Sequence, residues 1–407
     1  MPSRAILVVL ATVMINMTGV GLVWPILPKL IEELSTGTIS HVAITYGSIA
    51  VIFSVMQFAF GPIFGAMSDR FGRRPVMLVA LAGLGLDNLL LAMAPNLTWI
   101  FAGRALGGIF GSTFSVANAY MADVSTGKDR AAAFGMVGAA FGVGFVIGPA
   151  IGGLLGEVDL RLPFWFAAGL SFANLVFGLF FLEETLPAEK RRMVTLRELN
   201  PFAVLGWLVK QPTLLPLAIA FLVSNTMQRG LEAIWVLFTG LQYGWGAREA
   251  GLSLAIVGLS YVFVQGLLVK RTVARFGERA TMTGGFLLSA VIYALLSVNT
   301  SGIVGFVGIV PHVIGWGLAG PALQALASHQ VDAKSQGYLQ GSLSAIGGLS
   351  AILGPAASSS LFALFTSPSA PFAFPGAFFA IGLIALLLSA WIGTMAGGPA
   401  VKLRTDS

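Results

Sequence analysis

Long apolar runs alternate with short polar clusters along almost the whole chain. Each run is close to the roughly 20 residues that a helix needs to cross the hydrocarbon core of a bilayer. Breaking the chain at its polar clusters predicts twelve membrane spans. The predicted spans cover residues 5–27, 42–66, 75–95, 98–121, 132–155, 162–182, 213–240, 248–269, 280–298, 302–326, 337–363 and 372–395.

The most polar connector, residues 183–212, joins the sixth predicted span to the seventh and divides the chain in two. We therefore expect an N-terminal six-helix half over 1–182, a linker over 183–212 and a C-terminal six-helix half over 213–407. The first apolar run continues to about Leu27 without a small-residue cleavage site, which favours a first span over a signal peptide.

The composition agrees with this interpretation. Hydrophobic residues make up 56% of the chain and charged residues 10%, whereas a soluble domain carries about 25% charged residues. The chain has no cysteine and three histidines, which are far apart in sequence. The sequence contains no catalytic dyad or nucleotide-binding loop. We therefore expect no metal site and no enzyme.

Lysine and arginine concentrate on one predicted side of the membrane. They fall at both termini and in the connectors that follow even-numbered spans, whereas Lys29, Arg161 and Arg248 lie on the other side. Positively charged loops are typical of the cytoplasmic face. We therefore predict that both termini are cytoplasmic, and that the formal charge of +6 belongs to these loops and not to a nucleic-acid site.

The two halves repeat each other. Residues 70–74 (RFGRR) align with 275–279 (RFGER), and Gly148-Pro149 aligns with Gly354-Pro355 at nearly the same offset. Matching charged loops and matching Gly-Pro breaks indicate a duplication. Six-span halves in the same orientation are related by an axis along the membrane normal, and such a pair encloses a central cavity.

Residues 65–74 (GAMSDRFGRR) form a charged, glycine-punctuated segment between the second and third spans. We expect a tight turn, because glycine tolerates backbone conformations that other residues avoid, and its charges require a membrane face. An ordinary positively charged loop is the alternative. Asp123, at the end of the fourth span, can pair with this segment as a charge latch, or is a solvated carboxylate. The gating candidates here are Gly65, Asp69, Arg70, Gly72, Arg73, Arg74 and Asp123.

The fifth span has glycines at 144, 148 and 152, which form one smooth helix face suited to close packing against another helix. Pro149 removes a backbone donor and allows a kink. Gly144, Gly148 and Pro149 are therefore gating candidates, with a plain packing face as the alternative.

Two charged residues lie inside the third and fourth spans. Asp87 is near the middle of the third, and Arg104 is near the start of the fourth. Ionised groups are costly in hydrocarbon, so each must face protein or water. Both are candidate proton-coupling residues. The alternatives are a structural hydrogen bond for Asp87 and backbone carbonyl partners for Arg104.

The seventh span carries a polar stripe between two apolar stretches. Asn225, Gln228, Arg229 and Glu232 share one helix face and must line a cavity. Glu232 is a further proton-coupling candidate; if its pair with Arg229 never opens, its role is structural. The substrate-binding candidates are the stripe residues, nearby Trp235 and isolated amides in other spans: Asn16, Gln57, Asn118, Asn225, Gln228, Arg229, Trp235, Gln265, Gln324 and Gln340.

The chain resembles the major facilitator superfamily, and within it the tetracycline/proton antiporters. The resemblance rests on residues 19–28, 67–75, 86–92, 141–153, 275–279, 320–326 and 339–343. It implies an all-α membrane protein of twelve transmembrane helices in two pseudo-symmetric six-helix bundles. The implied function is proton-coupled efflux of a small amphiphilic drug, such as a tetracycline, by alternating access. The alternatives are a major facilitator for an unidentified metabolite and a membrane sensor or enzyme.

The resemblance has two departures. Asp87 matches an acid of the group's third span, but Asn16 and Ser289 stand where the group has acids in its first and ninth spans. We hypothesise that Glu232 takes over part of this missing charge. We further expect a multi-pass protein of the bacterial inner membrane that works as a monomer without a cofactor. Its expected partners are a small-molecule substrate, protons and lipid, with a divalent cation carried together with the substrate.

Overall fold

The computed structural model of the chain describes residues 4–35, 37–111, 113–125, 129–191, 202–332 and 335–395. Part of the predicted linker, residues 192–201, lies outside the described residues, as do Lys128 and Lys334 of the charge pattern.

The described residues are almost entirely helical. No water is available to backbone groups in hydrocarbon, and a helix satisfies these groups internally. One group of helices comprises α1 (Arg4–Val23), α2 (Leu27–Leu34), α3 (Ile39–Phe71), α4 (Arg73–Ala92), α5 (Leu97–Phe110), α6 (Thr113–Val124), α7 (Asp129–Val158) and α8 (Leu162–Phe181). The other comprises α10 (Leu215–Tyr243), α11 (Ala247–Phe263), the π-helix η2 (Val264–Leu268), α12 (Val269–Val298), α13 (Gly302–Ser328), α14 (Gln336–Thr366) and α15 (Ala377–Met395).

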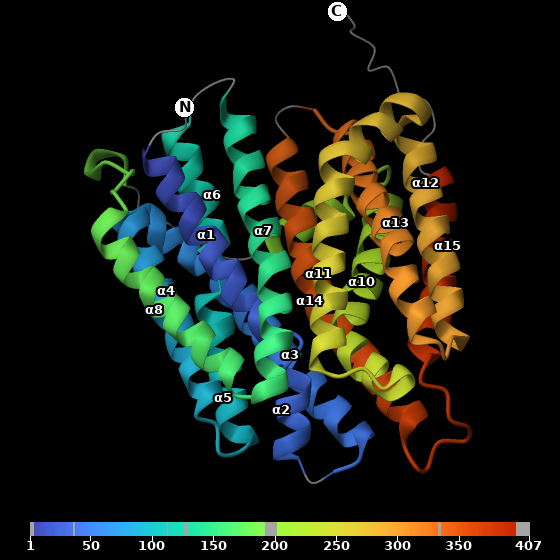
Figure 1. Ribbon diagram of the computed structural model, residues 1–407. Coiled ribbons are helices and arrows are strands. Elements are labelled where there is room, and N and C mark those ends of the chain that lie inside the picture. Colours follow the sequence, from blue (N-terminus) through green and yellow to red (C-terminus); the bar gives the residue numbers. More distant parts are fainter. Residues whose placement is uncertain are drawn as a thin grey trace, which may run out of the picture.

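The two groups stand side by side as a first and a second bundle (Figure 1). Between them in sequence are a short helix η1 (Ala188–Lys190) and α9 (Phe202–Val209). We call the side of the molecule that carries residues 183–191 the linker side, and the other the opposite side. Helix α7 runs from the linker side to the opposite side, and α11 runs back.

Ten stretches of the described chain are long and apolar enough to cross a membrane. The twelve predicted spans differ from these ten in two places. The stretch Ala247–Val298 contains both α11 and α12, and α10 is not among the ten because its polar stripe lowers its hydropathy. The predicted fourth span is one stretch, Leu97–Val124, that is divided at Gly111 into α5 and α6.

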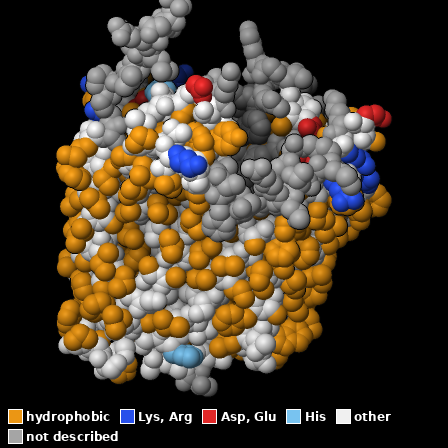
Figure 2. Space-filling model, turned by 180° about the vertical axis from the view of Figure 1, so that it is seen from behind, with side chains coloured by type: hydrophobic (Ala, Val, Ile, Leu, Met, Phe, Trp, Pro, Cys, Tyr) orange, Lys and Arg blue, Asp and Glu red, His pale blue; other side chains and the backbone are white. Residues whose placement is uncertain are grey.

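The surface agrees with a membrane-embedded molecule. Hydrophobic side chains cover most of the visible side, whereas lysine, arginine and acidic side chains gather near its upper rim (Figure 2). The chain is thus arranged as a multi-pass membrane protein, with apolar flanks for lipid and charges at a membrane face.

Both predicted charged loops are largely helical, which corrects the sequence prediction. Helix α3 continues to Phe71, and Gly72 alone separates it from α4. In the second bundle, Gly277 interrupts α12. Gly72 has φ 105° and ψ 161°, and Gly277 has φ 78° and ψ 167°. Glycine alone adopts this positive-φ region readily. The two aligned glycines therefore have the same backbone conformation, as a duplication predicts.

The bundles meet on the opposite side. A Cβ on Gly153 of α7 or Gly251 of α11 would lie within 3.0 Å of backbone atoms of the other helix, and Gly47 of α3 is as close to Ser359 of α14. On the linker side, Gly138 of α7 and Gly266 of η2 have nothing within 4 Å of an added Cβ. An added Cβ on Gly142 of α7 would lie 2.9 Å from Val262 of α11, so the contacts between these helices extend from the opposite side to about one helix turn from Gly138.

Candidate functional site

A cavity of about 320 Å³ lies between the two bundles. The second bundle supplies most of its wall, and the first supplies Trp24, just after the end of α1, together with Phe141, Gly142 and Phe145 of α7. Trp24 Nε1 donates a hydrogen bond of 3.4 Å to the backbone oxygen of Glu232, so the two bundles touch at the cavity wall. Aromatic and aliphatic side chains make up most of the wall, and its polar atoms come from few residues.

The polar stripe of α10 lies in this wall. Asn225, Gln228, Arg229 and Glu232 all line the cavity, as does Trp235, whose Nε1 donates to Ser253 Oγ at 2.9 Å. The Glu232 carboxylate accepts from two neighbours on its own helix. Arg229 Nη1 lies 2.9 Å from Oε2, and Gln228 Nε2 lies 3.1 Å from Oε1. The predicted pair is therefore formed, and its carboxylate is within reach of the cavity.

His312 of α13 is a site residue that the sequence analysis missed. It lines the cavity, and its Nε2 lies 3.1 Å from Gln228 Oε1. Its ring is 5.6 Å from the ring of Tyr293, whose hydroxyl donates to the backbone oxygen of Met227. The available signal was a single histidine beside Pro311 inside an apolar span; its contact with Gln228 depends on tertiary packing.

Asp87 and Arg104 form a second charged site inside the first bundle. Arg104 Nε donates to Asp87 Oδ1 at 3.2 Å, and Nη2 contacts Oδ2. The Asp87 side chain is 1% exposed and that of Arg104 is 14% exposed. Gly103 and Gly107 of α5 make room for the carboxylate, because a Cβ on Gly107 would collide with it. The partner of Arg104 is thus a carboxylate and not the backbone carbonyls of the alternative prediction.

Tyr46 lies near both charged sites. This tyrosine of α3 is buried, and both Arg104 and Glu232 are close enough to act on its hydroxyl through their charges. Neither Asp87 nor Arg104 lines the cavity. The carboxylate that faces the cavity is therefore Glu232 of α10, whereas Asp87 is enclosed within the first bundle.

The remaining predicted substrate-binding residues do not line the cavity. Two of them bond to backbone: Gln57 Nε2 donates to Gly111 O at 3.4 Å, and Gln265 Nε2 donates to Gly317 O at 3.2 Å. Asn16 is buried in α1. The other three lie in α6, α13 and α14, where the last two are exposed: Asn118, Gln324 and Gln340. Ser289, which stands where the tetracycline/proton antiporters have an acid, is buried in α12.

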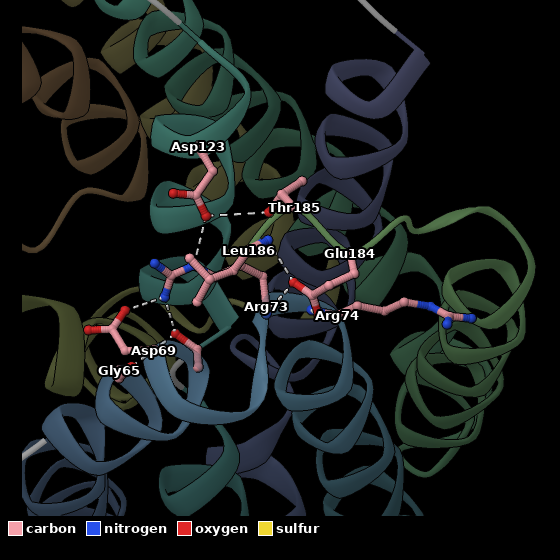
Figure 3. A network of polar contacts seen from close by, with 9 residues as sticks. Gly65, Asp69, Arg73, Arg74, Asp123, Glu184, Thr185 and Leu186 are labelled. Carbon is pink, nitrogen blue, oxygen red and sulfur yellow. Dashed lines mark hydrogen bonds and ion pairs between the residues drawn. The ribbon is translucent and has the colours of Figure 1, made fainter. Parts of the chain in front are cut away.

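Five of the predicted gating residues belong to a polar network on the linker side (Figure 3): Gly65, Asp69, Arg73, Arg74 and Asp123. Arg73 donates from Nη1 to Asp69 Oδ1 at 2.5 Å and from Nε to Asp123 Oδ2 at 2.9 Å. Asp123 thus pairs with Arg73, whereas the guanidinium of Arg70 lies over the Phe71 ring. Arg74 Nη2 donates to the backbone oxygen of Leu179, and Gly65 has open space beside it.

Glu184, at the start of the linker, is a further member of this network that the sequence analysis missed. Its carboxylate accepts from the backbone N–H groups of Arg73 at 2.9 Å and Arg74 at 3.3 Å, at the N-terminus of α4. Thr185 Oγ1 donates to Asp123 Oδ2 at 3.4 Å. An acid suits this position because a helix N-terminus attracts negative charge. The network ties α3, α4, α6 and the linker together.

The glycine face of α7 packs on α1 within the first bundle. A Cβ on Gly144 or Gly148 would lie within 3.0 Å of backbone oxygens of Met14 and Thr18. Pro149 lies inside the helix, and its backbone oxygen faces Gly251 of α11. The helix that carries the motif therefore contacts α1 with one face and the second bundle with another.

Comparison with known proteins gives a consistent result. The family profile described as Major Facilitator Superfamily matches residues 9–272 and 217–403. The chain is 39% identical to the class C tetracycline resistance protein of Escherichia coli, over 89% of this chain and 90% of that protein. It is 34% identical to the class B protein of Escherichia coli, over 89% of each chain. It is 29% identical to multidrug resistance protein 2 of Bacillus subtilis, over 93% of each.

Solved structures share the fold. The human organic anion transporter MFSD10 superimposes with a TM-score of 0.71 at 25% identity, over 97% of this chain and 100% of that chain. The nucleoside transporter NupG superimposes with a TM-score of 0.81 at 12% identity, with the same coverage.

Proposed function

The chain belongs to the major facilitator superfamily of membrane transporters, and we propose that it exports a small amphiphilic drug, such as a tetracycline, in exchange for protons. The observation that carries this proposal is an aromatic cavity between the two bundles with a carboxylate in its wall. Tetracycline and multidrug resistance proteins among its relatives support the drug class.

The cavity chemistry suits an amphiphilic molecule. Trp24, Trp235 and Trp316 offer flat apolar surfaces, whereas Asn225 and Arg229 offer hydrogen-bond donors. Aromatic surfaces contribute contact area, and a few polar groups fix the orientation of the ligand. A substrate with an apolar ring system and polar edges fits such a wall.

We assign proton coupling to Glu232 and Asp87, with Arg104 as the partner of Asp87. Glu232 is the acid that faces the cavity, and its side chain is 26% exposed. A group that exchanges a proton with solvent must be accessible to water in at least one conformation. Glu232 meets this requirement in the present conformation, and it stands in for the acids that Asn16 and Ser289 replace.

Transport then proceeds by rocking of the two halves, 1–182 and 213–407, about the cavity. We assign the linker side to the cytoplasm from the positive charges of its loops. In that orientation the present conformation, with its bundle contacts on the opposite side, is the inward-facing one. The polar network of Arg73, Asp123 and Glu184 is then a cytoplasmic element within the first half.

A drug-susceptibility panel in an efflux-deficient bacterial host tests the proposal. Expression of the chain should raise the inhibitory concentration of tetracyclines or of another amphiphilic drug severalfold. Glu232→Gln should remove this protection at equal membrane abundance, because its amide cannot cycle a proton. Glu33→Gln, a matched change of an exposed acid outside the cavity, should leave it intact. If no drug in the panel is affected by expression, the proposal is wrong and a metabolite transporter takes its place.

A further inference from the structure

A chain of hydrogen bonds leads from Glu232 across the cavity wall to α13. Glu232 Oε1 accepts from Gln228 Nε2 at 3.1 Å, and Gln228 Oε1 lies 3.1 Å from His312 Nε2. The second carboxylate oxygen, Oε2, accepts from Arg229 at 2.9 Å. Carboxylate, amide and imidazole thus form one continuous chain.

The chemistry of these groups fixes where each hydrogen lies. An ionised carboxylate can only accept, so the NH₂ of Gln228 must face Glu232 and its oxygen must face the imidazole. His312 Nε2 therefore carries the ring proton and donates. His312 is 7% exposed, and its Nδ1 has no hydrogen-bond partner among the described residues. Since the tautomer of a histidine follows the bonds of its nitrogens, Gln228 alone sets it.

We propose that Glu232, Gln228 and His312 form a reversible hydrogen-bond relay, in which Gln228 and His312 are positioning residues that let Glu232 gain and lose its proton in place. The inference rests on the proposed proton coupling and deepens it. It gives Glu232 a role beyond a permanent ion pair with Arg229.

The reversal follows from the contacts. Arg229 donates to Oε2, so an incoming proton binds Oε1, which faces Gln228. The new Oε1–H donates, and the Gln228 amide turns to offer its oxygen to Glu232. Its NH₂ then faces His312 Nε2, which must accept. The ring gives up its Nε2 proton to water and takes a proton from water at Nδ1, which is buried in this conformation and must open to water for the exchange. The ring stays neutral, and the cluster gains only the proton on Glu232.

Histidine suits the end of this relay because its neutral ring can donate or accept at the same nitrogen. A side chain that only donates or only accepts would hold the amide in one orientation and favour one state of Glu232. The titratable and charged groups around the carboxylate come from five helices: Arg229 of α10, Tyr46 of α3, Tyr261 of α11, Tyr293 of α12 and, through Gln228, His312 of α13.

Nitrogen-15 NMR of the histidine rings, in the full chain in lipid without substrate, tests the relay. A ring nitrogen that carries a proton resonates far from one that does not. At alkaline pH, wild type should show the Nε2–H form of His312. Glu232→Gln imitates the protonated acid, because its amide oxygen faces Arg229 and its NH₂ faces Gln228. This variant should shift His312 to the Nδ1–H form.

The matched control is Gln228→Met, which keeps the side-chain length and removes the amide. In that background Glu232→Gln should leave the His312 tautomer unchanged. His41 and His329, the other two histidines, report whether each variant is folded, and His312→Gln identifies the signal. One tautomer in both wild type and Glu232→Gln, or a switch that persists in Gln228→Met, overturns the relay. Because no substrate is present, this result is independent of the drug panel.

Discussion

The two acids of the proposed mechanism have different surroundings. Asp87 is enclosed, and its charge is balanced directly by Arg104, whereas Glu232 shares its charge between Arg229 and Gln228 beside a cavity. Removal of one partner from a buried ion pair strongly destabilises a protein, because the other charge stays buried without a partner. Asp87 therefore contributes to the stability of the first bundle as well as to the proposed coupling.

Removal of one charge from the Asp87–Arg104 pair should destabilise the protein more than removal of both. We expect Asp87→Asn to cost about 3 kcal/mol, near the lower end for breaking a buried pair, because asparagine still accepts a hydrogen bond. The double variant Asp87→Asn/Arg104→Gln should recover part of that loss. Thermal unfolding of the detergent-solubilised variants measures both effects. A double variant as unstable as the sum of its single variants would show that the two residues do not act as a pair.

The sequence predicted Asp87, Glu232 and the polar stripe of α10 as functional residues, because charged groups inside apolar spans are costly and therefore rare. It did not predict that Asp87 and Arg104 bind each other, since their contact depends on how α4 packs on α5. It missed His312 and Glu184 for the same reason. Neither residue stands out in the sequence. Each has its role because it contacts residues that are far away in sequence.

Among the helices, α10 and α13 supply most of the cavity wall, and α7 supplies part of the wall on the side of the first bundle. Helix α10 places its polar residues on one face toward the cavity, as its spacing predicted. Helix α7 uses its glycine face to approach α1 closely. The sequence predicted these elements well, since periodicity is local. It placed the charged loops less well, because a single glycine suffices where we expected a longer turn.

The two aligned glycines should respond differently to the same substitution. Alanine at Gly72 or Gly277 must adopt a strained backbone conformation, at a cost of about 1–3 kcal/mol. At Gly72 the added Cβ also meets the Glu184 carboxylate, whereas at Gly277 nothing lies within 4 Å. We therefore expect Gly72→Ala to lower the unfolding temperature more than Gly277→Ala. Equal losses, or a larger loss at Gly277, would mean that the docking of Glu184 on α4 adds little.

In the whole molecule, the two bundles stand side by side with the cavity between them. Their contacts extend from the opposite side, and Glu232 lies in the cavity wall. The duplicated sequence predicted two related bundles. It did not predict which side of the molecule is closed in this conformation, because both conformations of an alternating-access protein use the same sequence.

In the proposed mechanism, the bundles rock about the cavity in response to protons and substrate. The chain has no cysteine, so spin-label pairs can be introduced without other changes. One pair, Gly138→Cys with Gly266→Cys, spans the bundles on the linker side, and another, Val158→Cys with Arg248→Cys, spans them on the opposite side.

Pulsed electron–electron double resonance on these two pairs in lipid nanodiscs measures the distances as the pH is lowered and as a drug from the panel is added. If the bundles rock, the linker-side distance shortens while the opposite-side distance lengthens, and Glu232→Gln removes the response to pH. Distances that stay fixed, or that change in the same direction on both sides, would contradict this mechanism.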